Sequence, residues 1–146
     1  MPLSPLRPRI DLRVSFGAAA GHTPVDGATY YFAEASGLNP GTSDGAGAQV
    51  PYDAIINSVR LRFFVFGTPG SNENNSVYLR KNSATDSVAI TTTMQLTAAT
   101  VDISATALNF SISSGDTLYV KWVCPTFVTN PTTMFCAGHI TLELTN

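Results

Sequence analysis

The chain has 146 residues, which suits one domain able to bury about two-thirds of the surface of its unfolded chain. Charged residues make up 12% of the chain, about half of the usual share of roughly 25%. The formal net charge is -2, whereas a nucleic-acid-binding protein carries a basic patch. No apolar run approaches the roughly 18 residues that a membrane span needs. We therefore expect a protein that binds neither nucleic acid nor membrane.

The first nine residues differ in composition from the rest of the chain. Pro2, Pro5 and Pro8 exclude a helix and favour an extended arm. The segment has no hydrophobic stretch of the secretory type, so we expect a product of the cytosol. The sequence thus predicts an extended arm over residues 1–9 and one domain over residues 10–146.

Strand patterns dominate the chain, and no segment has helical periodicity. Ile10, Leu12, Val14 and Phe16 alternate with polar residues, which is typical of a half-buried strand. Residues 37–48 are rich in Gly, Pro, Ser and Asp and are predicted to form a long loop. The other strands are expected at 28–33, 55–66, 77–82, 87–94, 108–113, 117–124 and 135–144, with a short one at 101–103.

This succession of short strands and turns predicts an all-β fold, an antiparallel jelly-roll β-sandwich of about eight strands. An immunoglobulin-like sandwich is the alternative. Its Cys-Trp-Cys spacing is not met, because Trp122 precedes both Cys124 and Cys136.

The two cysteines flank a loop centred on Asn130 and Pro131. They would lie opposite each other, within reach of a disulfide, if the flanking segments formed a hairpin. In a cytosolic product the favoured interpretation is a pair of small buried hydrophobic residues. A zinc site is not expected, since no pair of histidines lies near them.

No motif indicates catalysis. The two histidines, His22 and His139, are not accompanied by a Gly-x-Ser-x-Gly turn, and the acidic residues stand singly, mostly in turns. We therefore predict no enzymatic activity, no catalytic residues, no metal and no cofactor. Glycan binding is an alternative, because a set of aromatic residues is available as a platform. These residues are Tyr30, Tyr31, Tyr52, Tyr78, Tyr119 and Trp122. Trp122 shares its parity with Leu118 and Val120 and is expected in the core.

The longest expected strand, 55–66, has two faces of different character. The core face is assigned to Ile55, Val59, Leu61, Phe63 and Val65, and the other face to Ile56, Ser58, Arg60, Arg62, Phe64 and Phe66. Exposed aromatic residues on a sheet usually mark an interface. Tyr119 and Val123 have the outward parity on a later strand and are expected to extend this surface. The sequence thus predicts an oligomer interface formed by Arg60, Arg62, Phe64, Phe66, Tyr119 and Val123.

Three segments, Val50 to Phe63, Leu79 to Asn82 and Gly115 to Leu118, resemble the small jelly-roll modules of phage structural proteins. Such modules occur in capsid decoration (cement) proteins and in the heads of tail or fibre proteins. The resemblance implies a homotrimer formed through sheet faces, and an extended terminal arm that docks on the shell.

From this resemblance we expect a decoration protein that is made in the host cytoplasm, lies on the capsid surface of the virion and binds the major capsid protein. The capsid-binding arm would comprise Pro2, Leu3, Pro5, Leu6, Arg7, Pro8 and Arg9. The alternative is a receptor- or glycan-binding head of a phage tail or fibre, although the chain has no repetitive shaft.

Overall fold

The computed structural model describes residues 6–33, 38–43, 47–82 and 87–145. The described residues form ten strands and no helix, which confirms the all-β class. The strands are β1 (Arg9–Phe16), β2 (Thr29–Phe32), β3 (Ala48–Gln49), β4 (Ala54–Val65), β5 (Asn75–Lys81), β6 (Ser87–Met94), β7 (Thr100–Ala105), β8 (Phe110–Ile112), β9 (Thr117–Val123) and β10 (Met134–Leu144). Of these, β3 was not expected, because the loop predicted over 37–48 contains its first residue.

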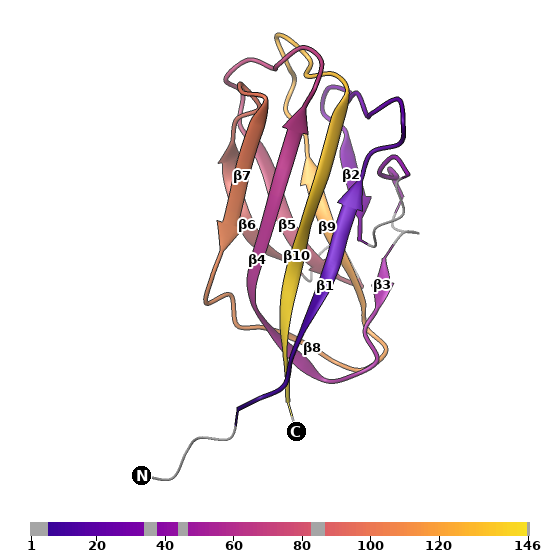
Figure 1. Ribbon diagram of the computed structural model, residues 1–146, viewed down its shortest axis with the longest axis vertical. Coiled ribbons are helices and arrows are strands. Elements are labelled where there is room, and N and C mark those ends of the chain that lie inside the picture. Colours follow the sequence, from indigo (N-terminus) through magenta and orange to yellow (C-terminus); the bar gives the residue numbers. More distant parts are fainter. Residues whose placement is uncertain (1–5, 34–37, 44–46, 83–86, 146) are drawn as a thin grey trace.

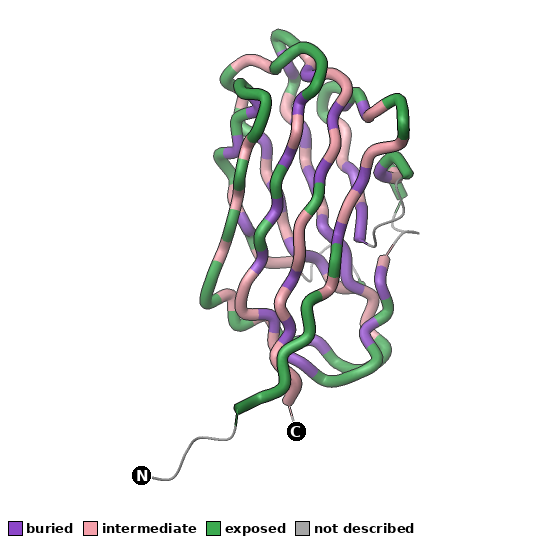
Figure 2. Tube along the Cα trace, in the orientation of Figure 1, coloured by how far each residue is buried: buried purple, intermediate pink, exposed green. Residues whose placement is uncertain are grey.

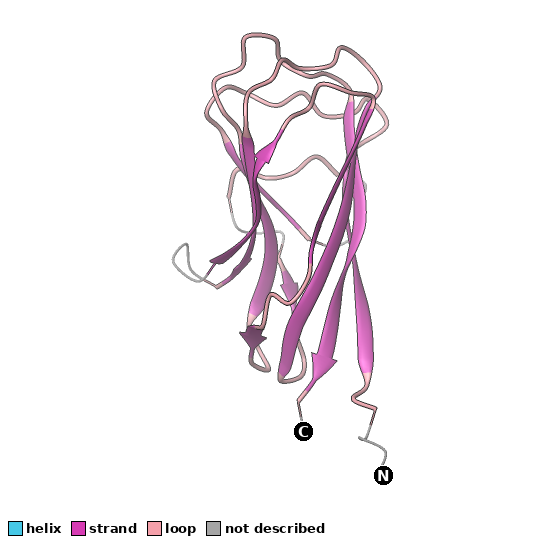
Figure 3. Cartoon of the chain, turned by 90° about the vertical axis from the view of Figure 1, so that its left-hand side faces the viewer, coloured by secondary structure: helices cyan, strands magenta, loops and turns pink. Residues whose placement is uncertain are grey.

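The strands form two antiparallel sheets that face each other (Figures 1 and 3). The first sheet has the order β1-β10-β4-β7, with β8 also beside β4. The second sheet has the order β2-β9-β5-β6, with β3 also beside β9. The prediction of an antiparallel β-sandwich is therefore confirmed.

The strand pairs are nested along the chain. The first strand pairs with the last, β2 and β3 pair with β9, β4 pairs with β7 and β8, and β5 pairs with β6. Contacts of β10 with β4 and of β9 with β5 then join these pairs into the two sheets. As a result, the chain enters and leaves the sandwich at the same end (Figure 1).

Along the strands, buried and exposed residues alternate, and the core lies between the sheets (Figure 2). Trp122 is fully buried, as its parity predicted. The ring of Phe16 stacks on it at 5.6 Å between centroids, and Phe63 meets it edge-on at 5.5 Å. The indole Nε1 donates a hydrogen bond to Oδ1 of the buried Asn75 at 3.0 Å. Asn75 Nδ2 in turn donates to the Met94 carbonyl at 3.1 Å, so this polar pair inside the core has its partners.

The lower part of β4 differs from the expected faces. Ile56 is fully buried and Ile55 only half-buried, the reverse of the prediction. The cause is a bulge against β10, since Thr141 pairs with Ser58 whereas Leu142 pairs with Ile56. The extra residue inverts the alternation on one side of the bulge.

The two cysteines do not face each other across a hairpin. Cys124 follows β9 in the second sheet, and Cys136 lies on β10 in the first. Both thiols are free and buried. Burial raises the pKa of Cys124 to about 12 and also raises the pKa of Cys136. The thiols therefore remain protonated near neutral pH, as expected of small core residues.

The expected boundary between arm and domain moves by two residues. Arg9 opens β1, pairs with Glu143 and forms an ion pair with it at 2.8 Å. The Leu144 N–H donates to the Pro8 carbonyl at 3.0 Å. Leu6 and Arg7 are exposed and lead away from the sandwich (Figures 1 and 2), whereas residues 1–5 of the predicted arm, with Pro2, Leu3 and Pro5, lie outside the described residues.

Candidate binding face on the first sheet

The six residues of the expected interface do not share one surface. Arg60, Arg62 and Phe64 lie on β4, on the outer face of the first sheet, and Phe66 follows that strand. Tyr119 and Val123 lie on β9 and point outward from the second sheet. They therefore cannot extend the surface formed by β4. The sequence could not exclude this, because parity shows which side of a strand a residue occupies but not in which sheet the strand lies.

Tyr119 is covered by its own chain, with only 6% of its surface exposed. Its ring meets Tyr31 edge-on at 6.2 Å, and the guanidinium of Arg80 lies 5.5 Å from the ring centre. A β-carbon on Gly47 would collide with the same ring. The residue thus packs within the protein, whereas Val123 is half-buried.

Strand register brings three basic side chains into one row on the outer face of the first sheet. Arg13 on β1 is paired with His139 on β10, which is paired with Arg60 on β4. Adjacent strands lie about 4.8 Å apart, so these side chains are close neighbours. Within the described residues, no carboxylate lies at ion-pair distance from Arg13 or Arg60. Among the described residues, the two arginines of this basic row (Arg13, His139, Arg60) therefore have no carboxylate partner.

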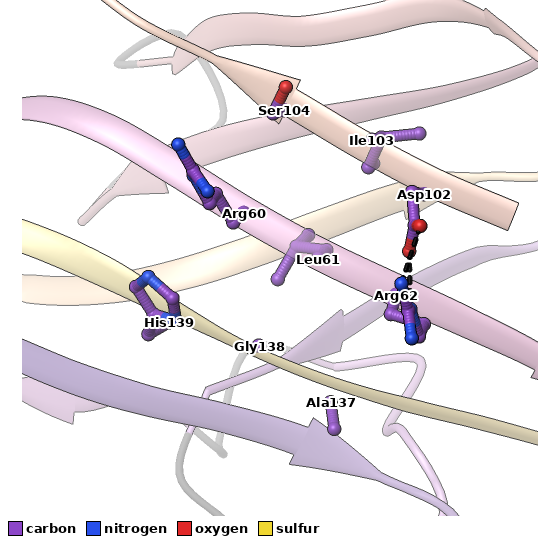
Figure 4. A pocket seen from close by; sticks show the side chains of 9 residues that line it. All are labelled: Arg60, Leu61, Arg62, Asp102, Ile103, Ser104, Ala137, Gly138 and His139. Atoms are coloured by element: carbon purple, nitrogen blue, oxygen red, sulfur yellow. Dashed lines mark hydrogen bonds and ion pairs between the residues drawn. The ribbon is translucent and has the colours of Figure 1, made fainter.

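The neighbouring row contains a paired charge. Arg62 Nε and Nη2 donate to the two carboxylate oxygens of Asp102 at 2.5 and 2.7 Å. These hydrogen bonds are the main cause that lowers the pKa of Asp102. Both side chains are more than half exposed, so the pair contributes little to stability. It does hold Arg62 in a fixed direction, beside the basic row (Figure 4).

A hollow of about 490 Å³ lies between these charged groups. Arg60, Arg62, Asp102, Ser104 and His139 surround it. It extends over β7, β4 and β10, and Ala137 on β10 has only a short side chain there (Figure 4). The face thus offers a recess lined with hydrogen-bond donors and a single carboxylate.

Three phenylalanines lie at one end of the same face. The rings of Phe64 and Phe66 stack with centroids 5.8 Å apart, and Phe135 meets Phe66 edge-on at 5.3 Å. Phe66 is 69% exposed, which is costly for a large aromatic side chain in water. Phe135, which pairs with Phe64 across β10 and β4, was not identified from the sequence. The alternation along its strand predicts that Phe135 points outward, but it does not predict the contact with Phe66. We call these three residues the aromatic cluster.

The aromatic platform considered for glycan binding is largely dispersed. Tyr30 and Trp122 are buried in the core, and Tyr52 is exposed beside Asp53, whose carbonyl accepts a hydrogen bond from the Thr145 N–H. The half-buried Tyr31 and Tyr78 remain, in register with Lys121 between them on the outer face of the second sheet. The Lys121 ammonium lies 5.5 Å from the Tyr78 ring centre.

The two histidines lie in different environments, His139 on the outer face and His22 in the core. The His22 ring packs edge-on against Tyr30 at 4.6 Å and Phe16 at 5.8 Å. Its buried Nε2 has no hydrogen-bond partner among the residues that the structure describes, and burial lowers the pKa of the ring. Among the described residues, no three of His, Cys, Asp and Glu are grouped as metal ligands.

The burial of His22 should make the stability of the fold depend on pH. The pKa of His22 lies below its ordinary value of 6.5 in the folded state, so below about pH 6.5 the unfolded chain binds the proton more readily. Stability contributed by the neutral ring should be lost as the pH falls from about 6.5 through the lowered pKa. Urea unfolding midpoints between pH 7.5 and 5 should fall less steeply for His22→Phe than for the parent protein. His139→Gln should retain the parent's steeper fall, and equal slopes for His22→Phe and the parent protein would contradict the assignment.

Comparisons of the chain with protein-family models, with curated proteins and with solved structures found no match. In the part of the chain that the structure describes, no helix is long and apolar enough to cross a membrane.

Proposed function

We propose that this protein is a structural component of a virion, a homotrimeric decoration protein that binds and stabilises a phage capsid shell and catalyses no reaction. One observation carries the proposal most directly: an exposed aromatic cluster and two arginines without a carboxylate partner among the described residues share the outer face of the first sheet. Such a combination is typical of a protein-binding surface, in which aromatic residues and arginine contribute most of the energy.

The nested strand order supports the assignment to the jelly-roll class. Folding one long antiparallel ribbon onto itself produces this order, with the first strand beside the last and the central hairpin in the opposite sheet. A single domain that uses a sheet face and a terminal arm as contacts suits a protein that acts by binding its neighbours. Each contact of standard size buries about 800 Å² per partner. Three linked copies would add avidity on the shell.

The arm provides the first test. A variant lacking residues 1–7 should fold, because Pro8 and Arg9 keep their contacts with Leu144 and Glu143. We expect it to lose binding to purified capsids in a co-sedimentation assay. Replacing residues 1–7 with a Gly-Ser segment of equal length provides the control for chain length and should also fail to bind. Normal decoration by the truncated protein would contradict a role of the arm in assembly.

The outer face provides the second test. Replacing Phe66 and Arg60 together by serine should weaken capsid binding about 10- to 100-fold. Each residue is a candidate binding hot spot, whose loss costs about 1 kcal/mol or more of binding free energy. Val128→Ser is the matched control, because Val128 is 85% exposed and lies in the loop between β9 and β10. Equal affinities of all three proteins, measured by sedimentation with labelled protein, would remove the outer face from the proposed contact.

A glycan-binding head is the second candidate function. Tyr31, Lys121 and Tyr78 favour it, because an aromatic ring and an ammonium side by side can stack on a sugar and bind its carboxylate. A signal on a glycan array that Tyr78→Ser abolishes, together with absence of capsid binding, would establish this function in place of the first.

A further inference from the structure

The sandwich is incomplete at the end where the chain enters it. Ile10 and Leu12 have the same parity as Val14 and Phe16, which are fully buried. Nevertheless Ile10 is 42% exposed. The second sheet does not extend this far, since β3, its nearest strand, has only two residues. Inward-pointing residues of β1 are therefore left without a covering layer in the described part of the chain.

An apolar groove of about 260 Å³ results. Ile10, Leu12, Leu142 and Leu144 of the first sheet line one side of it, and Val50, Pro51 and Tyr52 line the other together with Gln49. Almost no polar group faces this groove, so water inside it gains few hydrogen bonds. The groove suits aliphatic side chains.

The strand beside the groove has a free edge. Ser15 and Gly17 donate their N–H groups away from β10, to the carbonyls of Ala33 and Leu38. Asp11 and Arg13 have the same parity, but no acceptor for their N–H groups lies in the described residues. An unpaired edge next to an apolar groove is the arrangement that accepts an extended peptide as an added strand.

We infer that this groove binds the N-terminal arm of a second copy of the chain, with Leu3 and Leu6 as its apolar anchors. The arm has the required chemistry, since four of residues 2–6 are proline or leucine and none is charged. Leu6 is 98% exposed on its own domain, so it has no cover there.

The arm's own groove is a poor site for it. Pro8 is fixed to Leu144, which lines the groove, so the arm starts at the rim. To enter the same groove, the chain would have to reverse its direction within residues 5–8, where two prolines favour extended backbone. Leu6 to Pro8 instead lead away from the sandwich (Figure 1). A neighbouring copy can receive the arm without any reversal.

Exchange of this kind joins two different surfaces, an arm and a groove, and so forms a head-to-tail contact, which closes into a ring when the rotation between copies permits it. A three-membered ring would give the proposed homotrimer. The exchange itself does not depend on a capsid. The inference rests on the proposed function only in its assignment of the two binding surfaces. The arm then joins copies to one another instead of binding the shell, and the outer face of the first sheet binds the shell instead of joining copies.

Cross-linking in purified protein tests the inference without capsids. Ser4→Cys lies between the two anchors, and Tyr52→Cys lies at the rim of the groove, where Tyr52 is 56% exposed. When the two single variants are co-expressed with different tags, we expect a disulfide-linked heterodimer on non-reducing gels. Val128→Cys, on a distant loop, replaces Tyr52→Cys as the control and should give no such product. The native Cys124 and Cys136 are buried and should not contribute.

Two other results of the cross-linking overturn the inference. A disulfide formed only within the double variant Ser4→Cys/Tyr52→Cys, on a monomeric chain, would mean that the arm occupies its own groove. Absence of both products would mean that the groove does not hold the arm. Failure of cross-linking together with normal capsid binding would reject arm exchange and leave the proposed function intact. Successful cross-linking together with absence of capsid binding would retain arm exchange and reject the proposed function.

A second measurement concerns the anchors. Leu3→Asp combined with Leu6→Asp should weaken self-association about 100-fold or more, since neither anchor then buries an apolar side chain in the groove. Light scattering over a dilution series would show this as a shift from oligomer to monomer. Ser4→Asp adds a charge to the same arm without removing an anchor and should cause a much smaller shift. Equal effects of the two changes would contradict the roles of Leu3 and Leu6.

Discussion

Replacing Trp122 by alanine should destabilise the protein by about 3–5 kcal/mol, the usual cost of removing a large aromatic side chain from a core. The indole is fully buried and touches the rings of Phe16, Tyr30 and Phe63. Its loss also leaves Asn75 Oδ1 buried without its donor. Since domains of this size are stable by only about 5–15 kcal/mol, we expect a large fall of the urea midpoint in circular dichroism.

Trp122→Phe separates the two contributions. It retains most of the packing but removes the N–H group that donates a hydrogen bond to Asn75 Oδ1. We therefore expect an intermediate loss of about 1–3 kcal/mol in the free energy of unfolding. Val128→Ala, at an exposed position, should change the free energy of unfolding by less than about 0.5 kcal/mol. A stability of Trp122→Ala close to that of the parent protein would contradict the packing described for the core.

Replacing Gly138 by alanine should cost about 3 kcal/mol, at the upper end of the range for overpacking. The reason is the close approach of β10 and β4. A β-carbon on Gly138 would collide with the Arg60 carbonyl oxygen and would lie 2.8 Å from the Leu61 α-carbon. Backbone atoms in the middle of a sheet cannot move aside as a flexible side chain can, so the two strands would have to separate.

Thermal unfolding measures this effect. Ala137→Ser is the matched control, because it changes the neighbouring residue of the same strand, which is exposed on the outer face. We expect a decrease of the midpoint by about 10 °C or more for Gly138→Ala, and little change for Ala137→Ser. The same decrease for both variants would mean that β10 tolerates no change at all, and that the close approach at Gly138 is not the cause.

Local patterns were sufficient to predict most of the strands. Alternation along residues 10–16 identified β1, and the short segment at 101–103 proved to be the middle of β7 (Thr100–Ala105). Alternation failed within β4, where a bulge moved Ile56 into the core and Ile55 out of it. A bulge depends on the partner strand, which the pattern of a single strand does not contain.

The candidate face was predictable only in part. The outward position of Arg60, Arg62, Phe64 and Phe66 followed from parity within one strand. The assignment of Tyr119 to the same surface was wrong, because the pairing of β9 with β5 places it in the other sheet. The basic row and the contact of Phe135 with Phe66 arise from register between β1, β10 and β4. Register between distant segments is set by tertiary packing, so no local pattern could reveal these neighbours.

We propose that this protein acts in assembly, by binding neighbouring subunits of a virion. Electron microscopy of purified particles that carry the protein tests it most directly. We expect copies of the sandwich at symmetry-related positions on the capsid shell, with the outer face of the first sheet or the N-terminal arm against a neighbouring subunit. Particles whose shell lacks this density, or density confined to the tip of a tail fibre, would contradict it.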